Sequence, residues 1–161
     1  MFLRSYRRDD KRRLQQLFFD TVRTVNAEDY PHALLNAWAP DEPDRELWSQ
    51  LERQNCFLVE FQKTPVGFIS LSPSGSIDFL YVHKDFQGRG IAAALYKQVE
   101  RIARKKGLET LRTDTSVTAR GFFEKQGFTM LSEQKRLLRG HELRLCRMEK
   151  KLPQPAKNSG N

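Results

Sequence analysis

The feature that most constrains the fold is a change in hydrophobic period in the middle of the chain. Three apolar runs follow one another at 56–61, 66–71 and 76–83. Short turn-forming segments containing Pro, Ser or Gly separate these runs. Runs of this length between such segments are typical of β-strands, and connections this short join antiparallel neighbours. The sequence therefore predicts an antiparallel meander of three strands.

Helical periodicity flanks this meander on both sides. Before it, the pattern predicts a short strand followed by three helices, at 2–6, 10–27, 30–40 and 44–51. After it, the pattern predicts a helix, a strand, a short helix and two final strands, at 88–107, 108–115, 116–126, 128–138 and 142–150. This order of elements is typical of a mixed α/β domain.

Length and composition limit the class of protein further. A chain of 161 residues with 39% hydrophobic residues suits one domain with a single sizeable core. Its apolar runs are far shorter than the roughly 18 residues of a membrane span, and charged residues follow Met1 too closely for a secretory signal. Cys56 and Cys146 form no disulfide framework and no CxxC pair. We expect a cytoplasmic protein with one domain at 1–152 and a disordered tail at 153–161.

The charge balance favours anionic partners without choosing among them. Lys and Arg number 28 against 20 Asp and Glu, for a formal net charge of +8. Such a surplus suits a nucleic acid, a phosphorylated cofactor or an acidic surface, and it equally describes a solvated surface. His32, His83 and His141 lack the spacing of metal ligands, so we expect no metal site.

One loop carries a chemical signal. Between Val82 and Ala92 a predicted strand ends and a helix begins at Gly88 and Gly90. The first turn of a helix leaves four backbone N–H groups without partners, and the helix dipole adds positive charge there. Glycines let an anion approach those groups closely, so the segment suits a diphosphate. A plain strand-to-helix turn has the same pattern, and the motifs of P-loop and dinucleotide-binding proteins are missing.

Two blocks together resemble the GCN5-related N-acetyltransferases. Gln87-Gly88-Arg89-Gly90-Ile91-Ala92 is similar to the Arg/Gln-x-x-Gly-x-Gly/Ala signature of that family, and the strand at 79–82 resembles the family's fourth strand. Residues 119–128 resemble its Ala…Tyr-Glu-Lys-x-Gly-Phe helix and strand. The order of the elements also fits over residues 1–150.

The resemblance implies a fold, a co-substrate and a binding site. The fold is a single-domain, mixed and mostly antiparallel twisted sheet of six to seven strands flanked by helices, with splayed central parallel strands. The co-substrate is acetyl-CoA, whose pyrophosphate would lie on the 87–92 amides and whose pantetheine arm would lie along the fourth strand. The implied cofactor-binding residues are Tyr81, Val82, Gln87, Gly88, Arg89, Gly90, Ile91, Ala92, Ser116 and Phe123.

The chain departs from the family at two positions. The tyrosine that many relatives use as general acid corresponds to Phe123, and a family asparagine corresponds to Ser116. Phenylalanine has no proton to donate, so Phe123 is expected to pack against the pantetheine or in the core. Ser116 is expected to bind a water or to cap the following helix.

Acetyl transfer also needs a base, because an amine with a pKa of about 10.4 is almost entirely protonated at pH 7. Asp78 interrupts an apolar strand, and strand alternation places it on the face of Leu80 and Val82, toward the acceptor. The alternative is an exposed or capping aspartate. Tyr30 is a second candidate, as proton donor or substrate contact, and packing beside Trp38 is its alternative.

Three functions stay open from the sequence. The favoured one is transfer of an acetyl group from acetyl-CoA to a primary amine, by direct attack through a tetrahedral intermediate. A small-molecule acceptor is favoured over a protein amine. The second is a non-catalytic acyl-CoA-binding or sensor domain. A nucleic-acid-binding protein is suggested by charge alone, without any reading motif, so no nucleic acid is expected as a partner. A monomer and a homodimer are both compatible with the pattern.

Overall fold

The computed structural model describes residues 1–154. Within them lie seven strands and five α-helices. In chain order these are β1 (Phe2–Ser5), α1 (Lys11–Thr24), α2 (His32–Trp38), α3 (Arg45–Leu51), β2 (Asn55–Phe61), β3 (Thr64–Leu71), β4 (Ile77–Val82), α4 (Ile91–Lys105), β5 (Thr110–Ser116), α5 (Arg120–Lys125), β6 (Thr129–Leu138) and β7 (His141–Lys151).

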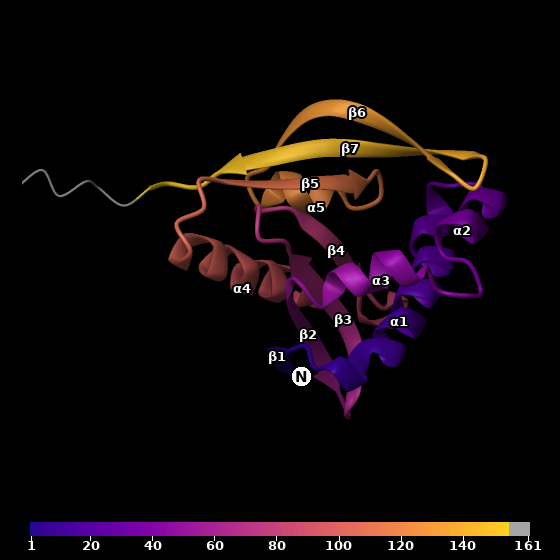
Figure 1. Ribbon diagram of the computed structural model, residues 1–161, viewed down its shortest axis with the longest axis horizontal. Helices are drawn as coiled ribbons and strands as arrows, with labels where there is room; N and C mark the ends of the chain where they lie inside the picture. The colour runs from indigo at the N-terminus through magenta and orange to yellow at the C-terminus, as the bar shows by residue number, and fades with distance from the viewer. Residues whose placement is uncertain (155–161) are drawn as a thin grey trace, which may run out of the picture.

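The strands form two sheets that meet at one point. β1, β2, β3 and β4 pair in sequence order as an antiparallel sheet, and β5, β7 and β6 form a second antiparallel sheet. A single parallel bridge, Ser76 to Arg112, joins them within the described chain. There the Thr113 hydroxyl donates to the Ile77 carbonyl at 2.9 Å. Beyond this point β4 and β5 diverge (Figure 1). The predicted fold class, with splayed parallel strands at its centre, is confirmed.

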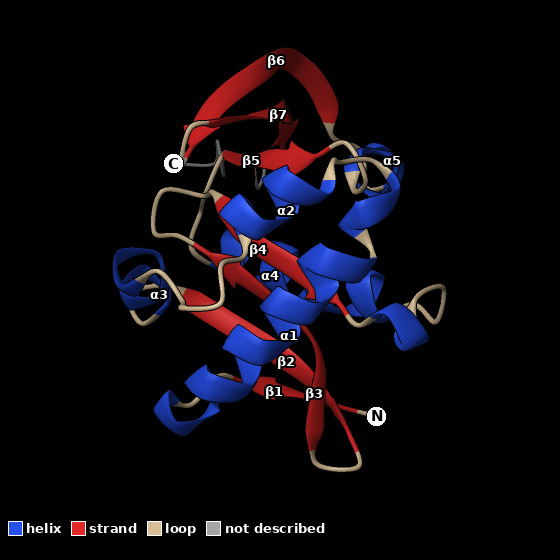
Figure 2. Ribbon diagram, turned by 90° about the vertical axis from the view of Figure 1, so that its right-hand side faces the viewer, coloured by secondary structure: helices blue, strands red, loops and turns tan. Residues whose placement is uncertain are grey.

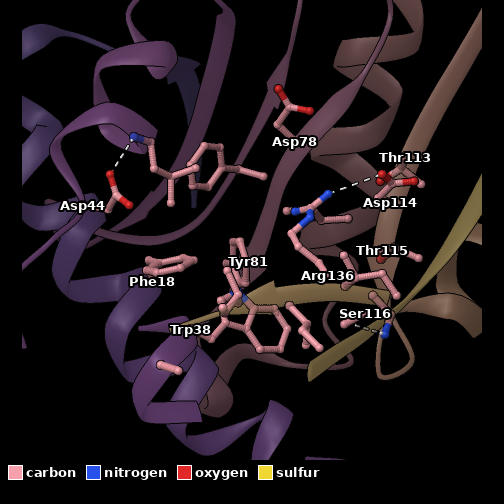
Figure 3. Close-up of a pocket in the computed structure, with 18 of the residues that line it drawn as sticks. Phe18, Trp38, Asp44, Asp78, Tyr81, Thr113, Asp114, Thr115, Ser116 and Arg136 are labelled. Carbon is pink, nitrogen blue, oxygen red and sulfur yellow. Dashed lines mark hydrogen bonds and ion pairs between the residues drawn. The ribbon is translucent and has the colours of Figure 1, made fainter. Parts of the chain in front are cut away.

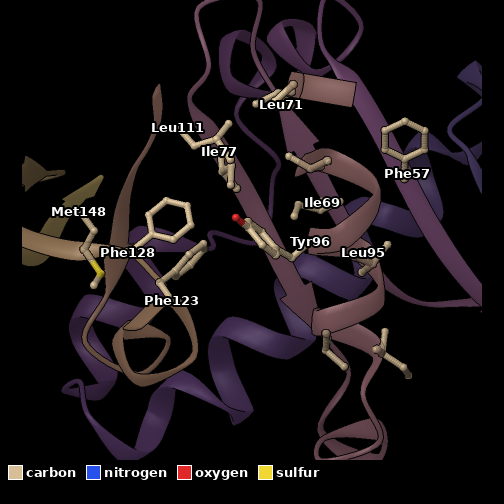
Figure 4. Packing of buried hydrophobic residues seen from close by; sticks show 14 of the residues in the cluster. Phe57, Ile69, Leu71, Ile77, Leu95, Tyr96, Leu111, Phe123, Phe128 and Met148 are labelled. Atoms are coloured by element: carbon tan, nitrogen blue, oxygen red, sulfur yellow. The ribbon is translucent and has the colours of Figure 1, made fainter. Parts of the chain in front are cut away.

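Helices cover the first sheet on both faces. Alternating residues of β2 face opposite cores, with Phe57 and Val59 on the α4 side and Leu58 on the side of α1 to α3. Figure 2 shows α1 and α2 in front of the sheet and α4 behind it. On the α4 side, Leu95 and Tyr96 pack on the sheet near Phe123 and Phe128 (Figure 4).

Local chemistry sets the ends of the helices. Asp44 caps α3 by accepting from the Glu46 and Leu47 N–H groups, as the sequence predicts. The helix predicted at 116–126 begins only at Arg120. The reason is that Ser116 ends β5, and its hydroxyl oxygen accepts from the Ala119 N–H at 3.2 Å. A serine bonded to nearby backbone in this way favours a turn over a helix.

The remaining global predictions meet the structure only in part. Among residues 1–154, no helix is long and apolar enough to cross a membrane. Cys56 and Cys146 are both buried free thiols. Leu152, at the predicted domain end, is buried and donates its N–H to the Glu109 carbonyl, and the domain bounds stay a prediction. Most of the predicted tail, residues 155–161, lies outside the described residues.

Candidate active site

The 87–92 loop presents a row of backbone N–H groups to solvent. Gly88 and Gly90 adopt positive φ angles of +72° and +80°, and residues 87–90 are exposed. In the part of the chain that the structure describes, no group accepts a hydrogen bond from the backbone N–H groups of 88–92. A Cβ built on either glycine would meet nothing within 4 Å. Free amides at a helix N-terminus beneath open space fit a diphosphate group.

A side chain fastens this loop to β4. The Gln87 amide nitrogen donates to the Val82 carbonyl oxygen at 2.6 Å. The Arg89 guanidinium lies 4.9 Å from the centre of the Phe86 ring. The Gln87 side chain therefore holds the loop against β4. Only the backbone of Gln87 is left for the anion binding predicted from the sequence.

The backbone of β4 faces two directions. The His83 N–H donates to the Val66 carbonyl on β3. Hydrogen bonds alternate along an antiparallel strand, so Tyr81, two residues earlier, also directs its backbone groups at β3. Leu80 and Val82 direct theirs at the gap beside β5. Tyr81 and Val82 are the two residues predicted to contact the pantetheine arm through their backbone. The backbone of Val82 faces the gap, whereas that of Tyr81 faces β3, and the backbone of Leu80 faces the gap as well.

A cavity of about 460 Å³ lies where β4 and β5 diverge. Its walls come from α1, α2, α3, β4, β5, α5 and the β6–β7 hairpin. Figure 3 shows Phe18, Trp38 and Asp44 on one side of it, and Asp78, Asp114 and Arg136 with hydroxyl side chains on the other. Its lining residues include Phe18, Trp38, Asp44, Leu47, Asp78, Leu80, Tyr81, Asp114, Ser116, Phe123, Arg136 and Arg139.

A second cavity of about 330 Å³ adjoins the first between α1 and α3. The two cavities have Phe18, Trp38, Asp44 and Leu47 in common, together with Pro40. Polar side chains of α1 line the far part of the second cavity, among them Gln15 and Gln16. The space available to an acceptor therefore extends away from β4 along α1.

Asp78 lies in the cavity wall, as predicted, but not by simple alternation. Ile77 and Val82 both pack in the α4-side core although they are five residues apart. A register shift opposite Ser70 and Leu71 leaves Asp78 as an extra residue in β4. Such a bulge redirects a side chain. The predicted common face of Asp78, Leu80 and Val82 is therefore interrupted at Asp78.

Two neutral donors hold the Asp78 carboxylate. The Gln54 amide nitrogen donates to Oδ2 at 2.6 Å, and the Ser76 hydroxyl donates to Oδ1 at 2.6 Å. Among residues 1–154 no Lys, Arg or His lies within ion-pair distance of Asp78. The side chain is exposed. Hydrogen bonds from Gln54 and Ser76 thus orient the Asp78 carboxylate, and no ion pair among residues 1–154 compensates its charge.

Tyr30 lies outside both cavities. Its hydroxyl donates to the Arg144 carbonyl at 2.8 Å and accepts from the Val117 N–H at 2.9 Å. Its ring packs edge-on against Trp38 at 5.3 Å, and burial raises the pKa of its hydroxyl. The buried hydroxyl has two backbone partners and ties the segment before α2 to β7 and to the end of β5. This geometry lends no support to the catalytic role predicted for Tyr30.

Ser116 and Phe123 both border the cavity on the β5 side. The Ser116 hydroxyl is engaged with the turn into α5. Phe123 is 1% exposed and packs edge-on against Phe122 and Phe128 at 5.3 and 5.1 Å. Core packing, expected for Phe123, matches the contacts it makes. Ser116 holds the turn before α5 and does not cap the helix, whose N-cap is Ala119.

A charged group in the cavity wall was missed by the sequence interpretation. The Arg147 guanidinium donates to both oxygens of Asp114, at 2.9 and 3.1 Å, and this bond lowers the pKa of Asp114. Arg136 reaches the same carboxylate at 3.4 Å. These residues lie on three different strands, so no local spacing brings them together in the sequence.

Comparison with known proteins agrees with this geometry. The family model described as an acetyltransferase (GNAT) domain matches residues 22–152. The chain belongs to the GNAT acetyltransferase family. A GNAT relative in Escherichia coli K12, the uncharacterized N-acetyltransferase YafP, is 31% identical over 139 residues, covering 86% of this chain and 87% of the relative.

Solved GNAT structures share the fold. A GCN5-related N-acetyltransferase from Rhodopseudomonas palustris, also titled a class-II aminotransferase, superposes with a TM-score of 0.88 at 31% identity, covering 94% of this chain and 95% of that one. The PaiA N-acetyltransferase of Thermoplasma acidophilum, solved with coenzyme A, superposes at 0.72 with 18% identity, covering 94% and 100%. Family membership makes this chain an acetyl-CoA-dependent acyltransferase.

Proposed function

We propose that this GNAT protein transfers the acetyl group of acetyl-CoA to a primary amine of a small molecule. The observation that carries the proposal is the cavity between the diverging strands β4 and β5, together with the unpartnered amides of residues 88–92, which follow β4 along the chain. A volume of about 460 Å³ lies within the range of small-molecule sites, roughly 300–1,000 Å³. Helices and the β6–β7 hairpin wall the cavity, which favours a small acceptor over a protein amine.

The chain supplies two sets of main-chain donors to the co-substrate. Acetyl-CoA brings an acyl group already activated as a thioester. The amides of 88–92 would hold its diphosphate, and the backbone of Leu80 and Val82 would pair with its pantetheine arm along β4. One of these two N–H groups, aimed at the gap, would also donate to the oxyanion of the tetrahedral intermediate. A donor of this kind lowers the barrier by about 3–4 kcal/mol.

Asp78 is the proposed proton acceptor. The attacking amine must lose a proton, because only about one molecule in 2,500 is neutral at pH 7 for a pKa near 10.4. The carboxylate borders the cavity and keeps its charge free of any cationic partner among the described residues. The proton on the amine would pass to Asp78 directly or through water. The departing thiolate, with a reference pKa of about 8.5, can leave without a tyrosine acid.

A specific observation favours one other function, a non-catalytic acyl-CoA-binding or sensor domain. Phe123, at the position of the family's acid, is buried in the core and has no proton to donate. Under this alternative the loop and the β4 backbone still bind coenzyme A, while no acceptor is modified.

The deciding experiment is thiol release from acetyl-CoA in the presence of a library of primary amines. Coenzyme A at 100 times its dissociation constant should stabilise the fold by about 2.7 kcal/mol under either function. Thiol release that depends on an amine supports the enzyme. Stabilisation by coenzyme A with no thiol release from any amine would establish the binding domain instead.

A further inference from the structure

We propose that the amine acceptor also carries a carboxylate, which Arg136 and Arg139 bind at the β6–β7 end of the cavity. This inference rests on the proposed function and names the chemical class of its acceptor. The acceptor is then a zwitterion, with its amine toward β4 and its carboxylate toward the hairpin. The guanidinium groups and carboxylates that border the cavity carry the inference.

Arg136 retains hydrogen-bonding capacity in the cavity. Its contact with Asp114 is a single one at 3.4 Å, whereas Arg147 takes both oxygens of that carboxylate at shorter distances. Asp114 is thus neutralised without Arg136, and the three side chains together carry one excess positive charge. Figure 3 shows the guanidinium of Arg136 beside Asp114 in the cavity wall. Arginine presents parallel N–H donors that match a carboxylate.

Arg139 occupies an unfavourable backbone position. Leu138 pairs with His141, so Arg139 and Gly140 form a two-residue turn in which both φ angles are positive, +47° and +81°. Asn, Asp and Gly are the residues that such a turn favours, and strained residues of this kind cluster at binding sites. The Arg139 side chain lines the cavity and makes no ion pair or hydrogen bond within residues 1–154.

The cavity is also bordered by carboxylates from other elements. Asp78 and Asp44 line the cavity from β4 and the start of α3. Asp78 accepts only from neutral donors, and one oxygen of Asp44 accepts the α3 N–H groups. A cavity bordered by carboxylates from β4 and the start of α3 and by guanidinium groups from β6 and the β6–β7 turn suits a molecule that has both an ammonium and a carboxylate.

The experiment compares pairs of acceptors that differ only in a carboxylate, such as lysine with cadaverine and phenylalanine with 2-phenylethylamine. The quantity measured is kcat/KM from thiol release, expressed as the ratio within each pair. We expect the carboxylated member to be preferred by at least about tenfold. Arg136→Gln should reduce that ratio by about tenfold to a hundredfold, mainly through KM, because charged hydrogen bonds to a carboxylate are lost.

Two further variants separate recognition from structure. Arg144→Gln is the matched control, because Arg144 is an arginine of β7 whose side chain faces Glu133 at 3.7 Å and lies outside the cavity. It should leave the ratio unchanged. Arg139→Asn removes the charge and suits the turn better. It should lower the ratio while leaving the unfolding temperature equal or higher, an outcome that a structural role for Arg139 would not produce.

The outcomes are distinguishable. Equal or better use of the amines that lack a carboxylate, or a ratio that Arg136→Gln leaves intact, would overturn this inference and leave the proposed function standing. Coenzyme A binding with no acetylation of any amine would overturn both.

Discussion

The two halves of the proposed site would bind by different means. The proposed co-substrate half consists of main chain, namely the amides of 88–92 and the backbone of Leu80 and Val82. The proposed acceptor half consists of side chains from eight helices and strands that surround the cavity. Main-chain donors recognise what every coenzyme A has in common, whereas side chains recognise what distinguishes one acceptor from another. One half can therefore stay constant across a family while the other changes with the substrate.

The largest expected effect breaks the main-chain half. Gly90→Glu places a side chain and a negative charge in the open space above the amides, on a residue with φ of +80°. Steric overlap with the diphosphate and like-charge repulsion of about 1–4 kcal/mol together predict a loss of coenzyme A affinity on the order of 100-fold or more, measured by calorimetry. Left-handed strain of about 1–2 kcal/mol lowers the stability of the fold instead.

Gly107→Glu is the matched control for that variant. Gly107 also has a positive φ, +73°, with nothing within 4 Å of a built Cβ, and it lies at the other end of α4. It should carry a similar strain and leave coenzyme A affinity unchanged. Tight binding by Gly90→Glu would mean that the diphosphate lies elsewhere.

The next effect tests the side-chain half at its reacting end. Asp78→Asn keeps the shape of the residue and removes its capacity to accept a proton. We expect kcat to fall by about 100-fold, within the range of general-base catalysis, while coenzyme A affinity stays within twofold. Asp29→Asn is the control, because that carboxylate also accepts from a neutral side chain, the Thr118 hydroxyl at 2.8 Å, and neither residue lines either cavity. Unchanged turnover in Asp78→Asn would remove Asp78 as the base.

A smaller effect concerns the frame behind the acceptor cavity. Tyr30→Phe leaves the Arg144 carbonyl and the Val117 N–H without their partner. Its free energy of unfolding should drop by about 1–3 kcal/mol, measured by urea denaturation, with kcat nearly unchanged. Tyr6→Phe is the contrast, because the buried Tyr6 hydroxyl has no partner among residues 1–154 and its removal should cost little. A large loss of kcat in folded Tyr30→Phe would restore Tyr30 as a catalytic candidate.

The smallest effect is a pH dependence of stability in the same half. The hydrogen bond from Arg147 lowers the pKa of Asp114 below its ordinary value of 3.8. A carboxylate with a lowered folded-state pKa stabilises the fold fully above the unfolded-state value and loses that contribution as the pH falls through the folded-state value. Asp114→Asn should therefore flatten the acid side of the stability profile below about pH 4. An unaltered profile would show that the pair contributes nothing to stability.

The sequence predicts the first half of the site far better than the second. Gly88 and Gly90 lie in one short segment, and the N–H groups beside them are unpartnered among the described residues, so the proposed diphosphate site can be predicted from local sequence. The meander, the cap at Asp44 and the α4 helix are local in the same sense. Periodicity and capping depend on residues a few positions apart, so these features can be predicted from the sequence.

The acceptor half depends on contacts that local patterns do not encode. Arg136 and Asp114 lie 22 positions apart and meet because β5 and β6 both pair with β7. Tyr30 resembled a site residue until its hydroxyl was found bonded to Arg144 and Val117, far along the chain. The direction of the Asp78 side chain depends on a bulge in β4, and that bulge is defined by the pairing of β4 with β3. Tertiary pairing decides each of these positions.

The lone bridge between Ser76 and Arg112 has a mechanical consequence. Because the two sheets share almost no main-chain hydrogen bonds among residues 1–154, a ligand bound between β4 and β5 would contact both sheets and hold them together. Amide protons on Leu80, Val82 and the facing edge of β5 should then exchange with solvent together, slowly when a ligand occupies the gap between β4 and β5 and rapidly when the gap is empty. Each catalytic cycle would stiffen the protein and loosen it again.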